Sequence, residues 1–148
     1  MKRMIAFFIV FIFLIAINFI PKNCVNFSNF EKLIVISSQE NFDSDFVKND
    51  NHFYYTFEKE EGKQLLKNID FGEIQGLVFY YSKDKLSYLL KNVDFYYQGQ
   101  DVEGMKVYYG YDNAFPNFNY IDGKKFNFQI VEKSTEIVLG YPMILCGY

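Results

Sequence analysis

The sequence predicts an α+β protein in which an N-terminal transmembrane helix precedes an antiparallel β-sheet with two helices on one face. Three observations support this prediction. The chain begins with a long apolar run, its middle contains a block that occurs twice, and its last third alternates strand patterns with turn signals. The first observation indicates a membrane segment, and the other two indicate one domain that combines helices with hairpin-connected strands.

The first twenty residues are typical of a membrane segment. Lys2 and Arg3 precede an apolar run over residues 4–20, and a helix of this run would be about 25 Å long, close to the thickness of a bilayer core. Ala16 has no small partner two positions away, so a cleavage site is not evident. We therefore expect residues 1–21 to remain as a signal anchor, with secretion after cleavage as the alternative. The basic flank predicts an N-terminus inside and a domain outside, in a single-pass cell-membrane protein.

The rest of the chain is expected to form a short juxtamembrane stem, residues 22–31, and one extracytoplasmic domain, residues 32–148. With Lys2 and Arg3 set aside, 13 basic and 18 acidic residues leave a net charge of about −5. Such a charge repels phosphate backbones, which argues against nucleic-acid binding. Cys24 and Cys146 could form a disulfide in an oxidising compartment; two unpaired thiols are the alternative.

The middle of the chain contains an internal repeat. Its longest block has seven residues and differs between the copies only by Ile against Val, so we predict the duplication of a strand-helix-strand unit. The matching segments are residues 53–56 and 79–82 (FYYT and FYYS), 65–71 and 89–95 (LLKNIDF and LLKNVDF), and 74–81 and 102–109.

Each copy begins with an aromatic triplet that suits a half-buried strand. Thr56 in the first copy and Ser82 in the second can cap the start of a helix, and Asn68 and Asn92 stand where these helices are expected to end. Both helices should pack on one face of the sheet. The second copy shows the i, i+3, i+4, i+7 spacing of one buried helix face, at Leu86, Leu89, Leu90 and Val93.

Short strands and turns are predicted on both sides of the repeat. Residues 37–51 are polar and predict a loop, whereas Asp122-Gly123 is a strong signal for a two-residue β-hairpin turn. A further turn is expected at Lys133-Ser134, so that the domain ends as a β-meander. The predicted strands are residues 33–36 before the repeat and residues 118–121, 124–131 and 136–139 after it.

Few residues suit metal binding or nucleophilic catalysis. His52 is the only histidine, which removes most metal sites built on imidazole and most Ser-His and Cys-His pairs. The loop with Asp43, Asp45 and Asp50 offers oxygen donors, but it lacks the glycine and the final glutamate of an EF-hand loop. We therefore expect no metal and no cofactor.

Carboxylates leave an enzyme open as an alternative. Asp70 and Asp94 hold equivalent positions in the two copies, and a pair of acids could cleave cell-wall glycan if they converged within about 5 to 10 Å. Asp112 and Asp122 are the other acids considered for such a pair. We expect instead that Asp70 and Asp94 are turn residues after helix ends, and we predict no catalytic residue.

Tyrosines are the best candidates for a binding surface, because the chain has 13 of them. Adjacent aromatic residues in a strand point to opposite faces, so each pair places one ring outward to keep the other inside. Outward tyrosines can stack on glycan rings or form a protein interface. The candidates for binding a ligand or partner are Tyr97, Tyr109, Tyr111 and Tyr120.

The repeated strand-helix pattern after a signal-like segment, together with the ending at residues 138–145, VLGYPMIL, resembles small secreted or anchored proteins of low-GC Gram-positive bacteria. The nearest named group is the YwmB-like proteins. This resemblance implies a fold similar to the duplicated TATA-box-binding arrangement and a role in the envelope rather than in DNA binding. It carries over no functional residue.

These patterns lead to one expected function and two alternatives. We expect a membrane-anchored extracytoplasmic interaction or accessory protein of the bacterial cell envelope without catalytic activity. Its partners would be the lipid bilayer, through the N-terminal helix, and an envelope protein or glycan. The alternatives are a carboxylate-dependent enzyme acting on cell-wall glycan or peptide, and a module that binds a small ligand or glycan without turnover.

Overall fold

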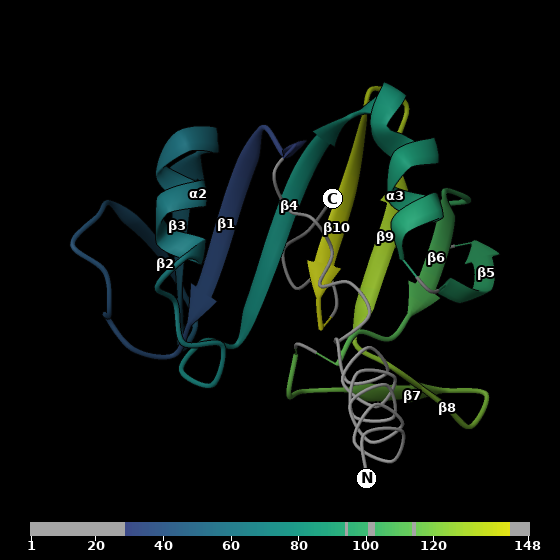
Figure 1. Cartoon of the computed structure of the whole chain (residues 1–148). Helices are drawn as coiled ribbons and strands as arrows, with labels where there is room; N and C mark the ends of the chain where they lie inside the picture. The colour runs from purple at the N-terminus through teal and green to yellow at the C-terminus, as the bar shows by residue number, and fades with distance from the viewer. Residues whose placement is uncertain (1–28, 94, 101–102, 114, 143–148) are drawn as a thin grey trace, which may run out of the picture.

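The computed structural model describes residues 29–93, 95–100, 103–113 and 115–142. Its strands form an eight-stranded antiparallel sheet in the order β2-β3-β1-β4-β10-β9-β6-β5 and a separate two-stranded sheet of β7 and β8 (Figure 1). The predicted α+β class, with a large antiparallel sheet and two short helices, is confirmed. The elements are β1 (Lys32–Ser37), β2 (Phe46–Asn49), β3 (His52–Glu58), α2 (Lys59–Leu66), β4 (Gly76–Ser82), the 3-10 turn η2 (Lys83–Lys85), α3 (Leu86–Asn92), β5 (Phe95–Gln100), β6 (Lys106–Gly110), β7 (Asn119–Ile121), β8 (Lys124–Phe126), β9 (Phe128–Glu132) and β10 (Glu136–Tyr141).

The predicted signal anchor lies outside the described residues, as do Cys24, Cys146 and most of the predicted stem. In the part of the chain that the structure describes, no helix combines the length and the apolar character needed to span a bilayer. The anchor, the stem and the disulfide therefore stay predictions.

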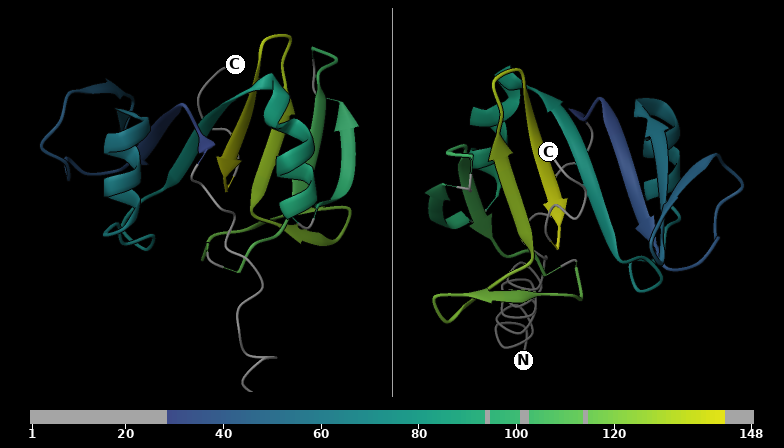
Figure 2. Two further views of the ribbon diagram at one scale, coloured as in Figure 1. Left: turned by 45° about the horizontal axis from the view of Figure 1, so that its top comes forward. Right: turned by 180° about the vertical axis from the view of Figure 1, so that it is seen from behind.

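Both helices lie on the same face of the large sheet, α2 beside β3 and β1 and α3 toward the other half (Figures 1 and 2). The main core fills the space between the helices and this face. Leu89 of α3 is fully buried in it and Val93 nearly so, while Leu86 and Leu90 are partly buried against it, so the predicted helix face is confirmed. The strands contribute alternate residues, among them Leu33, Val35, Tyr55, Phe79, Ile130 and Leu139.

The residues between these core positions point to the opposite face of the sheet. There Ile36, Val78 and Val138 form a second, smaller buried cluster. Cross-strand pairing brings them together, since β1, β4 and β10 are neighbours in the sheet. Both faces of the central strands are thus apolar, which explains why no clean alternation of polar and apolar residues marks these strands in the sequence.

The repeated blocks share part of their structure. Leu65 lies in α2 and Leu89 in α3, so the long block begins in a helix in both places, and each helix follows a strand. The helix ends at Leu66 in the first copy and at Asn92 in the second. The returning strands differ. β4 runs parallel to β3, with β1 antiparallel between them, whereas three successive antiparallel pairings make β6 antiparallel to β4. An internal duplication stays a prediction.

Two local predictions about the first half of the domain are wrong. Thr56 does not cap a helix, because β3 continues to Glu58 and α2 begins at Lys59 without a side-chain cap; Glu60 and Glu61 in the first turn suit the positive end of the helix instead. The predicted loop at residues 37–51 contains β2, an edge strand with every side chain exposed. Such a strand carries no alternation that a sequence could reveal.

Candidate functional site

The β5 edge of the large sheet carries Tyr97, the most exposed of the predicted site tyrosines in that sheet. Tyr97 of β5 pairs across the strands with Tyr109 of β6, and their ring centroids lie 5.7 Å apart. Tyr97 is 36% exposed. The ring of Phe126 packs edge-on against Tyr109 at 5.1 Å, so three rings form a continuous row from the sheet edge to the hairpin.

A bulge turns the start of β5 and brings an aromatic ring to each face of this edge. The register shifts between Phe95 and Tyr97, so that Phe95 packs on Tyr108 from the helix side, with centroids 5.4 Å apart. Gly99 then leaves room for the Tyr97 ring, because a Cβ atom at residue 99 would lie 3.1 Å from Tyr97 Cε1. Phe95 is 39% exposed, and the edge is therefore aromatic on both sides.

The β7–β8 hairpin stands below the large sheet in Figure 1 and has two different faces. Its turn is the predicted Asp122-Gly123, and the positive φ angles of 48° and 75° fit the two-residue hairpin turn that this dipeptide favours. The inward face carries Phe126, which is buried against Tyr109. The hairpin is thus packed against the same row of rings that reaches the β5 edge.

The outward face of the hairpin consists of Phe118, Tyr120 and Lys125. Tyr120 pairs with Lys125 across the hairpin, and the Phe118 and Tyr120 rings meet edge to face at 5.7 Å. Lys125 Nζ lies 4.2 Å above the centre of the Phe118 ring. Phe118 is 40% and Tyr120 63% exposed, so two aromatic side chains face solvent here.

Asn127 fixes the base of the hairpin. Its fully buried amide accepts a hydrogen bond from the backbone N–H of Asp112 at 2.7 Å and donates to the carbonyl oxygens of Asp112 at 2.6 Å and Phe115 at 3.1 Å. The chain leaves the small sheet and enters the large one at this residue. The single strand predicted over residues 124–131 is therefore two strands, β8 and β9.

The structure brings together only some of the predicted tyrosines. Tyr97 and Tyr109 touch, Tyr120 lies on the outward face of the hairpin, and Tyr111 is half-buried in the segment after β6. Sequence reasoning missed Phe118 and Lys125. A signal for them existed, because the predicted Asp122-Gly123 turn sets the register that places Tyr120 beside Lys125.

The acids considered for catalysis lie on separate elements. Asp122 is in the hairpin turn, Asp112 is buried beside Asn127, and Asp94 lies outside the described residues. Asp70 follows α2 and accepts a hydrogen bond from the Gly72 N–H at 2.8 Å, which confirms its role as a turn residue. Among the described residues there is no cluster of three or more metal-ligating side chains.

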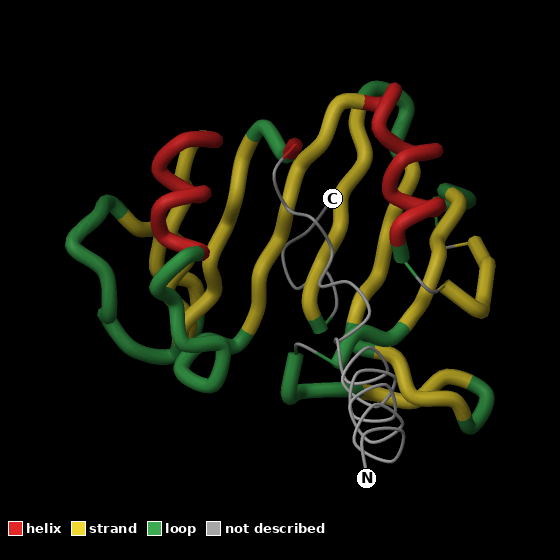
Figure 3. The backbone as a smooth tube through the Cα atoms, viewed as in Figure 1, coloured by secondary structure: helices red, strands yellow, loops and turns green. Residues whose placement is uncertain are grey.

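Asp70 does line a groove, whose walls come from the loop between β1 and β2 and the segment from α2 to β4. Figure 3 shows the course of the two loops. The groove has a volume of about 220 Å³ and is continued by a wider, open and polar depression that shares Asn41 and Glu73 with it. Glu73 is the only other carboxylate among the described residues that line the groove. Neither Asp112 nor Asp122 reaches it.

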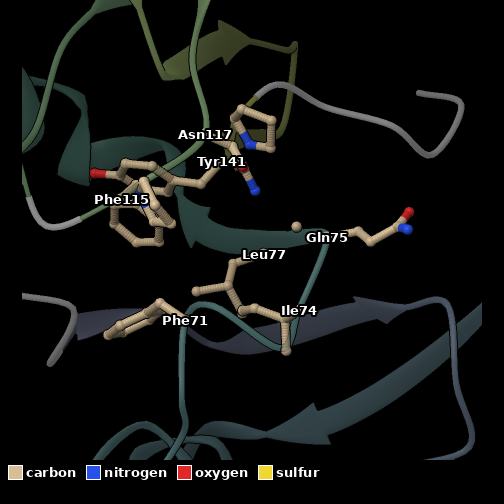
Figure 4. A pocket seen from close by; sticks show the side chains of 10 residues that line it. Phe71, Ile74, Gln75, Leu77, Phe115, Asn117 and Tyr141 are labelled. Carbon is tan, nitrogen blue, oxygen red and sulfur yellow. The ribbon is translucent and has the colours of Figure 1, made fainter.

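A second, tighter pocket lies between the start of β4 and the loop before β7 (Figure 4). Phe115 stacks on Tyr141 with centroids 3.6 Å apart, and Phe71 packs edge-on against Phe115. The remaining cavity of about 10 Å³ has room for about one water molecule. It is a gap in the packing and too small for a metabolite.

Comparison of the chain with protein-family models, with curated protein sequences and with solved structures gives no match. The resemblance to the YwmB-like proteins is therefore still an expectation from the sequence, and the function has to be argued from the surface just described.

Proposed function

We propose that the protein is a membrane-anchored extracytoplasmic interaction module of the bacterial cell envelope, without catalytic activity, and that it binds an envelope partner through the β5 edge. The observation that carries this proposal is the pair of exposed rings on that edge. Phe95 and Tyr97 present partly exposed aromatic rings on the two faces of one strand, and aromatic side chains are enriched in protein interfaces.

Side chains, rather than strand addition, are the proposed means of contact. β5 is the last strand in the sheet order and could in principle pair with a strand of another chain. The bulge between Phe95 and Tyr97 bends the edge, and bulges of this kind work against regular strand pairing. The partner would therefore contact the rings themselves, with Tyr97 supported from behind by Tyr109.

Site-specific photocrosslinking in intact cells tests this proposal. A benzoylphenylalanine in place of Tyr97 should give a discrete crosslinked product, whereas the same residue in place of Val47, on the β2 edge, should not. Val47 is a matched control because it is also on an edge strand and is 70% exposed. Phe95→Ala combined with the photoreactive residue should reduce the yield. Equal yields at the two edges would contradict a specific partner site.

The proposed location has its own test. The apolar run at residues 4–20 is long enough to stay in the membrane, so the full chain should resist extraction from membranes and its domain should be digested by protease added outside spheroplasts. A soluble mature protein, or a domain protected from protease, would contradict this part of the proposal.

A further inference from the structure

The outward face of the hairpin (Phe118, Tyr120, Lys125) is a surface that the β5-edge site does not use. Phe126 fills the inward face, so the hairpin already has its contact with the domain. The outward rings nevertheless stay exposed, and Tyr120 is the most exposed aromatic ring in the part of the chain that the structure describes. A stiff two-residue turn with two solvent-facing aromatics needs an explanation outside the core.

Charge on the hairpin differs from charge on the domain. Lys124 and Lys125 are adjacent and exposed, with Asp122 as the acid of the turn, whereas the chain after the predicted anchor carries about five excess negative charges. The hairpin is thus a small basic patch on an acidic domain. Lysines beside aromatic rings are the combination found where proteins meet the headgroup region of a bilayer.

The ring geometry disfavours a sugar as the occupant. Stacking on a glycan needs an open, flat ring face. Lys125 Nζ stands over one face of Phe118 at 4.2 Å, and the planes of Phe118 and Tyr120 are inclined by 84°, so the two rings make no flat platform. A lipid interface does not need a flat ring face, because aromatic rings are favoured there by their amphipathic character and not by stacking.

The position of the hairpin allows it to reach a bilayer. It extends from the end of the large sheet where β9 begins at Phe128 and β6 ends at Gly110, the end opposite to Lys32, where β1 begins (Figure 1). The sheet spans about 20 Å between these ends, taking six residues per strand. Phe30 is buried and the Glu31 N–H donates to the Tyr80 carbonyl oxygen, so residues 21–28 supply the remaining reach. They could extend to about 26 Å, which is long enough for the hairpin end to face the membrane.

We propose that the outward face of the hairpin docks on the anionic lipid surface of the bilayer in which residues 4–20 are anchored. This inference rests on the proposed anchoring. Phe118 and Tyr120 enter the headgroup region, and Lys125 of the same face lies near lipid phosphates, with Lys124 beside the turn adding positive charge from the other face. Docking fixes the orientation of the domain on the membrane. It also holds the β5 edge at a defined distance from the bilayer surface, because Tyr109 and Phe126 join this edge to the hairpin.

The absence of tryptophan from the chain makes a direct experiment available. The full-length Tyr120→Trp variant is reconstituted into vesicles of phosphatidylcholine and phosphatidylglycerol, with and without lipids brominated near the headgroup. We expect its tryptophan emission to shift to the blue and to fall about twofold with brominated lipid, because the ring lies in the interface. Lys124→Glu with Lys125→Glu, or high salt, should reverse both effects.

A Val47→Trp variant is the matched control, because it puts the same reporter on an exposed strand far from the hairpin. Its emission should be insensitive to brominated lipid. Thermal melting followed by circular dichroism must show each variant to be folded. Equal quenching in the two variants, or quenching of the Tyr120→Trp variant by soluble wall glycan but not by brominated lipid, overturns the proposal.

Carbonate extraction of the same vesicles separates the two claims. A chain that resists extraction but shows no quenching of the Tyr120→Trp variant retains its anchor and refutes the docking alone. A chain that is extracted refutes the anchor, and the same quenching measurement with vesicles added to the extracted protein then decides whether the hairpin binds lipid.

Discussion

The large sheet and the two-stranded sheet are held by different kinds of interaction. The large sheet is stabilised by an apolar core to which many fully buried side chains contribute. The hairpin of β7 and β8 has three residues in each strand, and its contacts with the large sheet include the ring contact of Phe126 with Tyr109 and the buried amide of Asn127. Stability is therefore spread over many residues in the first region and is concentrated in very few in the second.

Two buried polar groups, one in each region, differ in their hydrogen bonding. The side-chain amide of Asn127 makes three hydrogen bonds. The Tyr81 hydroxyl, buried in the core of the large sheet, has no hydrogen-bond partner among the described residues. A polar group with partners sets the position of an element, and one without partners only weakens the core around it. The hairpin, which carries the exposed rings, is thus positioned by the polar contacts of Asn127 together with the ring contact of Phe126.

The largest effect is expected from a cavity in the core of the large sheet. Phe79 is fully buried and packs against Phe30, Tyr81 and Tyr141. Phe79→Ala should lower the free energy of unfolding by about 3–5 kcal/mol, measured by urea unfolding in detergent micelles. Phe46→Ala, at a half-exposed ring of the β2 edge, is the control and should cost less than about 1 kcal/mol. Similar losses in the two variants would mean that this core does not dominate stability.

A smaller and more local effect is expected at the base of the hairpin. Asn127→Ala removes the side-chain hydrogen bonds to the N–H of Asp112 and to the carbonyl oxygens of Asp112 and Phe115 and should cost about 1–3 kcal/mol. Hydrogen exchange should accelerate in β7 and β8 more than in β9 and β10. Asn127→Asp keeps the acceptor but buries a carboxylate that faces two carbonyl oxygens, so it should cost at least as much as Asn127→Ala. Uniform acceleration across both sheets would show that the hairpin is not a separately held unit.

The fold was predictable where local chemistry decides it. The apolar spacing of α3 and the Asp122-Gly123 turn each depend on a few neighbouring residues, and both are found as predicted. β2 was missed because all its side chains are exposed. The break at Asn127 was missed because only the position of Asp112 and Phe115 in space explains why the chain changes sheet there.

The candidate site was predictable only in part, for a similar reason. Tyr97 and Tyr109 stood out in the sequence as outward tyrosines, but their contact depends on the register of β5 against β6 and on the bulge after Phe95. No sequence pattern sets that register. The pairing of Tyr120 with Lys125 is different, since a two-residue turn determines it, and a stricter use of the turn would have predicted the outward face of the hairpin.

The Tyr81 hydroxyl, which has no hydrogen-bond partner among the described residues, gives a third and smaller test of the contrast between the two sheets. Burial raises the pKa of Tyr81, with a minor contribution from Tyr88. The folded protein therefore holds this proton more tightly than the unfolded chain does, so stability is complete below about pH 10 and falls as the pH rises above it.

Tyr81→Phe should change stability at neutral pH by less than about 1 kcal/mol, since no hydrogen bond is lost. Above pH 10 the variant should lose about 1.4 kcal/mol less per pH unit than the wild type does. The measurement is urea unfolding at several alkaline pH values. Tyr120→Phe, at an exposed ring, is the control and should leave the slope unchanged. A large loss at neutral pH would reveal a partner for the Tyr81 hydroxyl and remove the contrast with Asn127.

The smallest effect is expected at Asp70, which belongs to neither sheet. Its carboxylate accepts one hydrogen bond from Gly72 within an exposed turn, and an asparagine side chain can accept the same bond. Asp70→Asn should therefore change the free energy of unfolding by less than about 0.5 kcal/mol, whereas Asp70→Ala, which removes the acceptor, should cost about 1 kcal/mol. In cells lacking the natural gene, both variants should restore function. If Asp70→Asn instead abolished function while its melting curve matched the wild type, the groove that Asp70 shares with Glu73 would become the active site of a carboxylate-dependent enzyme, and the non-catalytic function proposed above would be wrong.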